Sequence, residues 1–351
     1  MKVLTVIGNR PQFIKAAAVS PLLADELLVH TGQHHDDRLS RIFFDELGIP
    51  EPAVQLGVAG GSNTSQTARQ LAALEPVLAE SDADVVLVYG DTNSTLAGAL
   101  AASQAGVPVA HVEAGMRSYD RAMPEEVNRV LVDHLSSLLL CSSRVGIDQL
   151  RAEGVVEGVV DVGDVMVDTA LRVQASAASR SDLLVSHGVA PGGYVLATAH
   201  RAGNVDSPER LAALVALLNG VAAEVPVLLP LHPRTRSRMA AAGLSFVSEV
   251  RVCEPLGYVE LNALLCGARA ALTDSGGLQK EAYLAGVPCI TMRPSTEWVE
   301  TVEAGWNTLV DLSLEAALSA LSTKAPAERP PLYGDGRAGE RVVAALAERF
   351  G

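Results

Sequence analysis

Residues 2–18 read KVLTVIGNRPQFIKAAA, and this stretch predicts how the chain folds. The run KVLTVI is apolar and rich in β-branched residues, as in a buried strand, and the alanine-rich segment that follows is typical of a helix. In an open α/β sheet the loop between such elements lies at the carboxyl end of the strand, where ligands bind, and the amino end of the next helix favours anions. Arg10 and Lys15, in and just after this loop, therefore predict an anionic ligand.

The same alternation of strand and helix continues along the chain. Further strands are predicted at 27–31, 84–90, 107–113, 137–142 and 159–164, and a second series at 194–199, 225–231, 268–273, 287–292 and 307–312. The small, polar residues 174–193 between the two series are typical of a linker. We therefore expect an α/β fold with two Rossmann-like, doubly wound domains, residues 1–173 and 190–330, facing each other across a cleft. A closing helix is expected over 337–351.

Composition argues against some classes of partner. The 351 residues carry a formal net charge of −14, whereas nucleic acids and anionic membranes usually bind a basic surface. No apolar run approaches membrane length and no charged, then apolar leader precedes the first predicted strand, so we expect a cytoplasmic protein. The four cysteines form no C-x-x-C pair and are expected to be reduced, buried thiols.

Polar residues follow the predicted strands in both halves of the chain. Asp91 follows the strand at 84–90, and Glu113 ends the strand at 107–113. In the second half the corresponding residues are His200, Arg201, His232 and Asp274. Because carboxyl ends of parallel strands meet at one edge of a sheet, these side chains could converge on one site.

The segment TDSGGLQKEA, residues 273–282, is a candidate phosphate site. Ser275, Gly276 and Gly277 precede a predicted helix, where backbone N–H groups can cradle a phosphate, and Glu281 one turn later could accept from ribose hydroxyls. The alternative is that the glycines only permit a tight turn. No G-x-G-x-x-G motif or P-loop follows any predicted strand, which counts against a nicotinamide dehydrogenase, and we expect no cofactor.

Three carboxylates, Asp91, Glu113 and Glu125, are candidates for acid–base chemistry. The neighbours of Glu113 are apolar or small, so its charge there is either paired or functional. For Asp91 or Glu125 alone, the alternative is an ordinary helix N-cap. If the three share a cleft, their mutual repulsion raises the pKa of at least one, which provides both an acid and a base near neutral pH.

Basic side chains could neutralise an anionic ligand in this otherwise acidic chain, although any one of them could equally be a solvated surface group. The candidates are Arg10, Lys15, His200, Arg201, His232, Arg234 and Arg293. His30, His34 and His35 lack the spacing of a catalytic zinc helix, so no metal site is expected.

Together these segments resemble the non-hydrolysing UDP-N-acetylglucosamine 2-epimerases. In the family's order, GNRPQFIK (8–15) is similar to G-x-R-P-x-x-I-K, YGDTNST (89–95) to the G-D-T segment, HVEAGMR (111–117) to H-[VI]-E-A-G-[LM]-R, MPEEVNR (123–129) to P-E-E-x-N-R, ATAHR (197–201) to the His-Arg segment, and LTDSGGLQKEA (272–282) to L-T-D-S-G-G-x-Q-x-E. The resemblance implies two domains arranged as in GT-B glycosyltransferases, a closing helix packed on the first domain, a homodimer, and a role in cell-surface polysaccharide biosynthesis.

The resemblance also implies a reaction and residue roles. The family loses UDP from UDP-GlcNAc by anti-elimination, forms a 2-acetamidoglucal, and re-adds UDP to give UDP-ManNAc. Carried over by motif, Asp91, Glu113 and Glu125 would be the acid–base groups, and His200 would stabilise the departing diphosphate. The substrate-binding set would be Arg10 and Lys15 for the phosphates and sugar face, Ser275, Gly276 and Gly277 for a phosphate, Glu281 for the ribose, Tyr258 near the uracil, and the basic candidates His232 and Arg293.

Three segments depart from the family pattern. Residues 33–37, QHHDD, replace Q-H-R-[EQ]-M, a region that helps bind an allosteric UDP-GlcNAc in bacterial members. The sequence therefore leaves open whether this chain has an allosteric site. Gly203 stands where H-R-x-E-N has its acid, and residues 296–300 read TEWVE in place of T-E-R-P-E. TEWVE is similar to the corresponding segment in a branch of the family that acts on UDP-2,3-diacetamido-2,3-dideoxyglucuronate. This sugar is therefore an alternative substrate for the chain. A hydrolysing epimerase, a GT-B glycosyltransferase and a silent nucleotide-sugar sensor are further alternatives.

Overall fold

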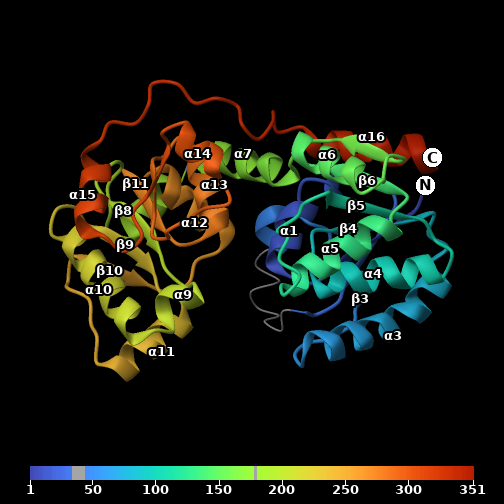
Figure 1. Ribbon diagram of the computed structural model, residues 1–351, viewed down its shortest axis with the longest axis horizontal. Coiled ribbons are helices and arrows are strands. Elements are labelled where there is room, and N and C mark those ends of the chain that lie inside the picture. Colours follow the sequence, from blue (N-terminus) through green and yellow to red (C-terminus); the bar gives the residue numbers. More distant parts are fainter. Residues whose placement is uncertain (34–43, 178–179) are drawn as a thin grey trace. The chain divides into compact units, whose positions relative to one another are not determined.

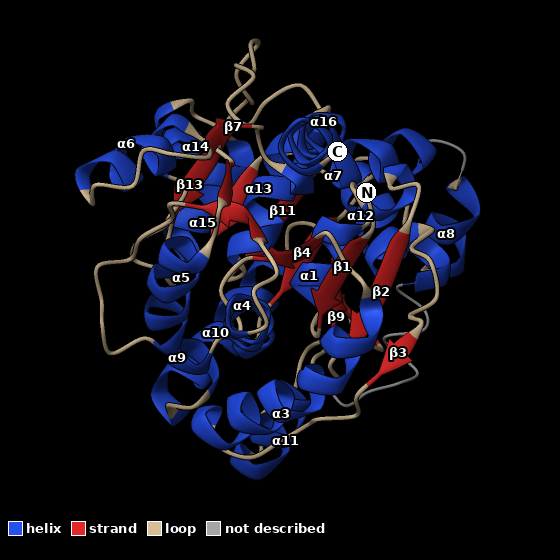
Figure 2. Ribbon diagram, turned by 90° about the vertical axis from the view of Figure 1, so that its right-hand side faces the viewer, coloured by secondary structure: helices blue, strands red, loops and turns tan. Residues whose placement is uncertain are grey.

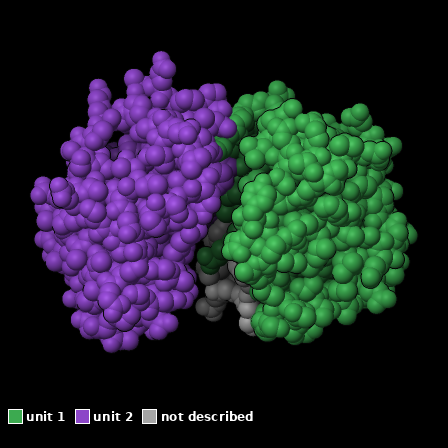
Figure 3. Space-filling view, in the orientation of Figure 1, with its two compact units in different colours: residues 1–169, 333–351 green, residues 170–332 purple. Residues whose placement is uncertain are grey.

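The computed structural model describes residues 1–33, 44–177 and 180–351, and the chain forms two compact units. Unit 1 comprises residues 1–169 and 333–351, and unit 2 comprises residues 170–332 (Figure 1, Figure 3). Among the helices of the described residues, none combines the length and hydropathy needed to cross a membrane.

Unit 1 is built on a seven-stranded parallel sheet in the order β3-β2-β1-β4-β5-β6-β7. Its strands are β1 (Val3–Ile7), β2 (Glu26–His30), β3 (Val54–Gln55), β4 (Val85–Tyr89), β5 (Val109–Ala114), β6 (Leu138–Cys141) and β7 (Val159–Asp161). Its helices are α1 (Arg10–Ala16), the 3₁₀ helix η1 (Ser20–Leu22), α3 (Asn63–Ser81), α4 (Asn93–Gln104), α5 (Pro124–Leu135), α6 (Arg144–Ala152) and α16 (Ala338–Phe350); α7 (Val165–Ala177) begins in unit 1 and ends in unit 2. Every residue of β1 and β4 is buried, as expected for parallel strands covered on both faces (Figure 2).

Unit 2 is built on a six-stranded parallel sheet in the order β10-β9-β8-β11-β12-β13. Its strands are β8 (Val195–Thr198), β9 (Val227–Pro230), β10 (Val250–Cys253), β11 (Ala270–Thr273), β12 (Cys289–Thr291) and β13 (Asn307–Leu309). Its helices are α8 (Ser181–Ser186), α9 (Ala202–Val205), α10 (Pro208–Ala222), α11 (Pro233–Ala242), α12 (Tyr258–Cys266), α13 (Gly276–Ala285), α14 (Val299–Glu303) and α15 (Leu314–Ser322).

Each sheet has one point at which the strand order reverses. In unit 1 the chain goes from β1 outward to β3 and then returns to β4 on the other side of β1. In unit 2 the chain goes from β8 outward to β10 and then returns to β11 on the other side of β8. Loops leave in opposite directions at such a point and open a crevice at the carboxyl ends of the strands. The structure thus places one crevice beside Gly90 and another beside Asp274.

The two parallel sheets confirm the predicted α/β class of doubly wound domains. Two strands, β3 and β10, were not predicted, because β3 has only two residues and the edge strand β10 buries only Val250 completely. The residues 174–193, expected as a linker, instead contain the end of α7 and the whole of α8. Their small, polar composition is compatible with short helices that leave one face exposed.

Helix α16 is fixed to unit 1 through its first turn. The carboxylate of Asp168 accepts from the backbone N–H groups of Ala338 at 3.1 Å and Gly339 at 2.7 Å. Gly339 also packs closely against the backbone just before η1. An added Cβ at this position would be 2.1 Å from the carbonyl oxygen of Ala18. This contact leaves no room for a larger residue.

Replacing Gly339 by Ala is therefore expected to displace the start of α16 and lower the stability by about 1–3 kcal/mol, a fall of several degrees in Tm. The matched control is Gly203→Ala in α9, where an added Cβ meets no atom within 4 Å. Thermal unfolding by circular dichroism checks both variants. Equal Tm values for the two variants would contradict the close approach of α16 to Ala18.

Candidate active site

The loop after β1 is held by the side chain of Gln12. Asn9 caps α1 by accepting from the Gln12 N–H at 3.2 Å, and Pro11 pre-organises the first turn. The Gln12 side chain accepts from the Gly8 N–H at 2.7 Å and donates to the Tyr89 carbonyl at 3.0 Å. Gln12 thus ties the end of β1 to the end of β4 at the point where the strand order reverses.

Lys15 and Glu113 form an ion pair at this edge of the sheet. Burial lowers the pKa of Lys15 to about 8, although the nearby charge of Asp91 opposes this shift. Gly90 has a φ of +65°, and an added Cβ there would lie 2.9 Å from Lys15 Nζ and 3.4 Å from Glu113 Oε2. The turn after β4 therefore requires glycine in order to admit the ion pair.

Glu113 has an unusual backbone conformation for a residue with a side chain. Its φ is +74°, and the register between β5 and β6 shifts between Val112 and Ala114. A β-bulge of this kind re-aims one side chain relative to the alternation of the strand. Left-handed backbone costs on the order of 1–3 kcal/mol at such a residue, so the surrounding structure must hold it.

Asp133, in the last turn of α5, binds residues on both sides of Glu113. Its carboxylate faces His111 Nδ1 at 2.7 Å and accepts from the Gly115 N–H at 3.1 Å and from Arg117 at 2.6 Å. Burial opposes the ionisation of Asp133, but the hydrogen bonds from His111 and Arg117 outweigh it and hold the pKa of the carboxyl below its ordinary value. Asp133 is thus an anionic anchor beneath the bulge.

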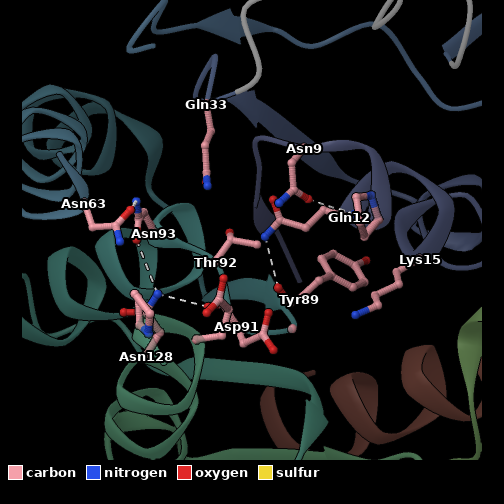
Figure 4. Close-up of a pocket in the computed structure, with 14 residues that line it drawn as sticks. Asn9, Gln12, Lys15, Gln33, Asn63, Tyr89, Asp91, Thr92, Asn93 and Asn128 are labelled. Carbon is pink, nitrogen blue, oxygen red and sulfur yellow. Dashed lines mark hydrogen bonds between the residues drawn. The ribbon is translucent and has the colours of Figure 1, made fainter. Parts of the chain in front are cut away.

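Two pockets that share Gly90 and Asp91 lie at this edge of unit 1. The larger has a volume of about 250 Å³, and its lining includes Lys15, Asp91 and Glu125 (Figure 4). The smaller has a volume of about 50 Å³, and its lining includes Asp91 and Glu113. The structure therefore brings the three predicted carboxylates and Lys15 together.

Neither Asp91 nor Glu125 is a helix N-cap, which was the alternative left open for both. Asp91 pairs with Arg129, and the cap of α4 is the next residue, Thr92. Glu125 lies in the first turn of α5 with an exposed side chain, and the capping position of that helix is Met123. Neither carboxylate is therefore needed to complete a helix end.

Glu126, beside Glu125, is a residue that sequence reasoning missed. Its buried carboxylate accepts from the Ser118 N–H at 2.8 Å and the Tyr119 N–H at 3.0 Å. It therefore shapes the loop between β5 and α5 and leaves Glu125 for the pocket. The paired acids in the sequence gave no sign of which one faces inward.

In unit 2 the buried side chain of Asp274 holds the loop after β8. It accepts from the backbone N–H groups of His200 at 3.2 Å and Arg201 at 3.0 Å, and from the side chain of Asn204 at 3.1 Å. Asn204 also donates to the Met292 carbonyl at 3.0 Å. The imidazole of His200 remains about half exposed, at 45%, so it can contact a ligand.

The predicted phosphate segment forms the amino end of α13. Ser275 caps the helix, so the bare N–H groups of Gly276 and Gly277 follow at its first turn. The carboxylate of Glu297 lies beside Gly276, where an added Cβ would be 3.5 Å from Glu297 Oε2. The tight turn and a phosphate site are compatible here, because the cap leaves these backbone N–H groups at the start of the helix.

Two of the predicted cations converge on Glu297. Arg293 binds its carboxylate through both terminal nitrogens at 2.8 Å, and Arg201 approaches it at 3.4 Å. The bonds from Arg293 lower the pKa of Glu297 to about 2. The Glu297 carboxylate therefore already pairs with both guanidinium groups.

Glu281 and Tyr258 lie together on α13 and α12. Burial raises the pKa of Glu281 to about 7, even though a hydrogen bond with Tyr258 opposes the shift. Glu281 can therefore be neutral near physiological pH and act as either donor or acceptor for a hydroxyl. Of the remaining candidates, Arg10 begins α1 but does not line either pocket, and His232 caps α11 by accepting from the Arg234 N–H at 3.2 Å.

Within residues 1–33, 44–177 and 180–351, no group of three or more His, Cys, Asp or Glu side chains is arranged to hold a metal ion. His34 and His35, together with Asp36 and Asp37 of the departing segment, lie outside the described residues. Arg234 pairs with Asp206 on the surface of unit 2.

The raised pKa of Glu281 predicts a pH-dependent stability. Its folded pKa of about 7 exceeds the ordinary value of 4.5, so the folded state binds more protons between these values. Stability from this group is fully present below about pH 4.5 and is lost as the pH rises through about 7, by on the order of 3 kcal/mol. Glu281→Gln should therefore lose less stability than the wild type between pH 5 and 8 in urea unfolding. Parallel curves for the two proteins would contradict a buried, protonated Glu281.

Comparison with known proteins gives one family. A family model described as UDP-N-acetylglucosamine 2-epimerase matches residues 22–347. The chain is 48% identical over 361 residues to the UDP-2,3-diacetamido-2,3-dideoxy-D-glucuronate 2-epimerase of Pseudomonas aeruginosa, covering 99% of this chain and 100% of that protein.

Solved structures agree with the sequence relatives. The UDP-GlcNAc 2-epimerase of Methanocaldococcus jannaschii, in complex with UDP-GlcNAc and UDP, matches with a TM-score of 0.86 at 38% identity over 99% of this chain and 100% of that chain. The calicheamicin glycosyltransferase CalG4 matches with a TM-score of 0.59 at 16% identity, over 100% of this chain and 99% of that chain, and shares the fold alone. The chain belongs to the UDP-N-acetylglucosamine 2-epimerase family.

Proposed function

We propose that this protein interconverts UDP-GlcNAc and UDP-ManNAc by inverting C2 of the sugar. The observation that carries the proposal is the grouping of Asp91, Glu113 and Glu125 with Lys15 where the strand order of unit 1 reverses. Such a grouping supplies both proton acceptors and proton donors, which a reaction at an unactivated carbon requires.

The C2–H bond of an N-acetylhexosamine has no adjacent carbonyl, so simple proton exchange there is unfavourable. Elimination avoids this difficulty. A carboxylate takes the C2 proton, the electron pair forms the C1–C2 double bond, and the C1–O bond breaks with its pair going to UDP. UDP then re-adds to C1 while an acid delivers a proton to the opposite face of C2. We assign these proton transfers to Asp91, Glu113 and Glu125.

The residues of unit 2 suit the nucleotide part of the substrate. The N–H groups of Gly276 and Gly277, with the cap Ser275, suit a phosphate, and the exposed imidazole of His200 suits the departing diphosphate. The neutral form of Glu281 suits a ribose hydroxyl, with Tyr258 beside it. Arg201 and Arg293 already bind a carboxylate and can exchange it for a phosphate.

A second substrate is favoured by a specific observation. The relative at 48% identity over its full length is named for UDP-2,3-diacetamido-2,3-dideoxy-D-glucuronate. This chain also carries the TEWVE segment, in which Trp298 donates from Nε1 to the Gly276 carbonyl at 2.8 Å. The reaction at C2 would be the same for both sugars.

Three expectations stay predictions: a homodimer and a role in cell-surface polysaccharide synthesis, which the resemblance implies, and a cytoplasmic location. For the homodimer, α5 offers a candidate surface. Met123, Val127 and Leu131 recur every four residues on one side of this helix and its cap, with 39%, 38% and 47% of their surfaces exposed.

Incubation with each UDP-sugar in D₂O, followed by proton NMR at C2, tests the proposal. We expect deuterium at C2 together with the C2 epimer, and a decrease of about 10²–10⁴ in kcat for Asp91→Asn, Glu113→Gln and Glu125→Gln. Glu80→Gln, at an exposed position of α3, is the control and should retain full activity. No epimer from either sugar would refute the epimerase, and stoichiometric free sugar would indicate hydrolysis instead.

The lowered pKa of Lys15 predicts the alkaline limb of activity. Below about pH 8 Lys15 is a cation paired with Glu113, and above this pH it loses its proton. We expect kcat/KM of the wild type to fall above about pH 8. Lys15→Arg keeps its charge, so its residual activity should show no such decline. The same decline in both proteins would assign the limb to another group.

A further inference from the structure

The larger pocket of unit 1 is lined by an unusual number of side-chain amides. They are Asn9, Gln12, Gln33, Asn63, Asn93 and Asn128. Gln12 is fully used in tying β1 to β4, through bonds to Gly8, Tyr89 and Thr95. The hydrogen bonds of the other amides define which of their oxygen and nitrogen atoms have partners.

The orientations of Asn9 and Gln33 are fixed by backbone N–H groups. Asn9 Oδ1 accepts from the Gln12 N–H at 3.2 Å, and Gln33 Oε1 accepts from the Ser94 N–H at 3.1 Å. A backbone N–H can only donate, so the oxygen of each amide must face it and the NH₂ group must face the other way. Figure 4 shows the amide nitrogen of Gln33 pointing toward the pocket.

The orientation of Asn63 follows from a chain of amides that starts at Asp91. The backbone carbonyl of Asp91 can only accept, so the nitrogen of Asn128 faces it at 2.9 Å. The same nitrogen donates to Asn93 Oδ1 at 3.4 Å, and Asn93 Nδ2 donates to Asn63 Oδ1 at 3.1 Å. The NH₂ group of Asn63 is thus left over (Figure 4).

Three amide donors therefore remain for a ligand. Among the described residues, no group accepts from Asn9 Nδ2, Gln33 Nε2 or Asn63 Nδ2. Neutral NH₂ groups match carbonyl oxygens, whereas a phosphate would call for cations, and Lys15 is the one cation among the lining residues. The chemistry of this pocket fits an amide substituent.

We propose that this amide-lined pocket binds the acetamido groups of the sugar and selects UDP-sugars with a second acetamido group at C3. The inference rests on the proposed function, because it takes Asp91 and Glu125, which line the same pocket, to act at C2. Substituents on C2 and C3 then lie within this lining. Three donors exceed the two lone pairs of a single acetamide carbonyl, so a second carbonyl completes the match.

Isosteric variants can remove the donors while keeping the internal bonds. Gln33→Glu retains the oxygen that accepts from Ser94, and Asn63→Asp retains the oxygen that accepts from Asn93. Each replaces an NH₂ group by an oxygen that repels a ligand carbonyl. Gln104→Glu, exposed at the end of α4, is the matched control for the change in charge.

The experiment compares two substrates that differ only at C3: UDP-2-acetamido-2-deoxyglucuronate, with a hydroxyl, and UDP-2,3-diacetamido-2,3-dideoxyglucuronate. UDP-GlcNAc is assayed in parallel as the test of the epimerase itself. For the wild type we expect kcat/KM to be higher with the diacetamido sugar. Gln33→Glu and Asn63→Asp should each lower kcat/KM for that sugar by about 10- to 100-fold and lower it several-fold less for the 3-hydroxy sugar. Gln104→Glu should match the wild type with both.

Each contrary result has a distinct meaning. Equal losses with both substrates, or no loss with either, would overturn the C3 subsite and leave the epimerase intact. A wild type that acts on UDP-GlcNAc but not on the diacetamido sugar would also overturn the subsite. A wild type that forms no epimer from any of the three sugars would refute the proposed function, and the inference with it.

Discussion

The buried carboxylate of Asp133 is the interaction on which the candidate site of unit 1 depends. It accepts from Gly115 and Arg117, and it faces His111, whose other ring nitrogen lies 2.7 Å from the Gly90 carbonyl. His111 therefore bridges the Asp133 carboxylate and the Gly90 carbonyl. One anion in α5 thereby holds both the bulge that carries Glu113 and the turn that precedes Asp91. Removing it would take one buried, charged partner from both His111 and Arg117, which typically costs about 3–5 kcal/mol.

Unit 2 also holds a loop with a buried carboxylate. Asp274 follows β11, next to the point at which the strand order reverses, and its carboxylate gathers the N–H groups of His200 and Arg201. Asn204 adds a third donor. Buried acids in both units therefore shape loops and leave neighbouring side chains to meet a ligand. The cost of burying each charge is offset by several directed donors.

The sequence predicts the fold class and the strand-end positions well, because apolar runs and their spacing reflect burial directly. It does not reveal which polar residues hold loops in place through buried hydrogen bonds. Asp133 sits in an ordinary amphipathic helix, and Glu126 is indistinguishable from its neighbour Glu125 until the fold shows that one is buried and the other exposed. Similarly, β10 escapes prediction because its edge position exposes Arg251 and Val252 and removes the buried apolar run. Such roles arise from contacts between distant segments, which no local pattern encodes.

Charge balance explains how an acidic protein can suit a nucleotide diphosphate. Several cations of each unit are already paired: Lys15 with Glu113 and Arg129 with Asp91 in unit 1, and Arg201 and Arg293 with Glu297 in unit 2. A phosphate that approaches Arg293 must compete with a carboxylate held by two hydrogen bonds at 2.8 Å. Binding therefore depends on the difference in free energy between the ion pair of Arg293 with phosphate and its ion pair with Glu297. The displaced carboxylate must then find water or another donor. Counting cations in the sequence overstates the free positive charge, whereas the backbone N–H groups at the start of α13 need no counter-ion to be displaced.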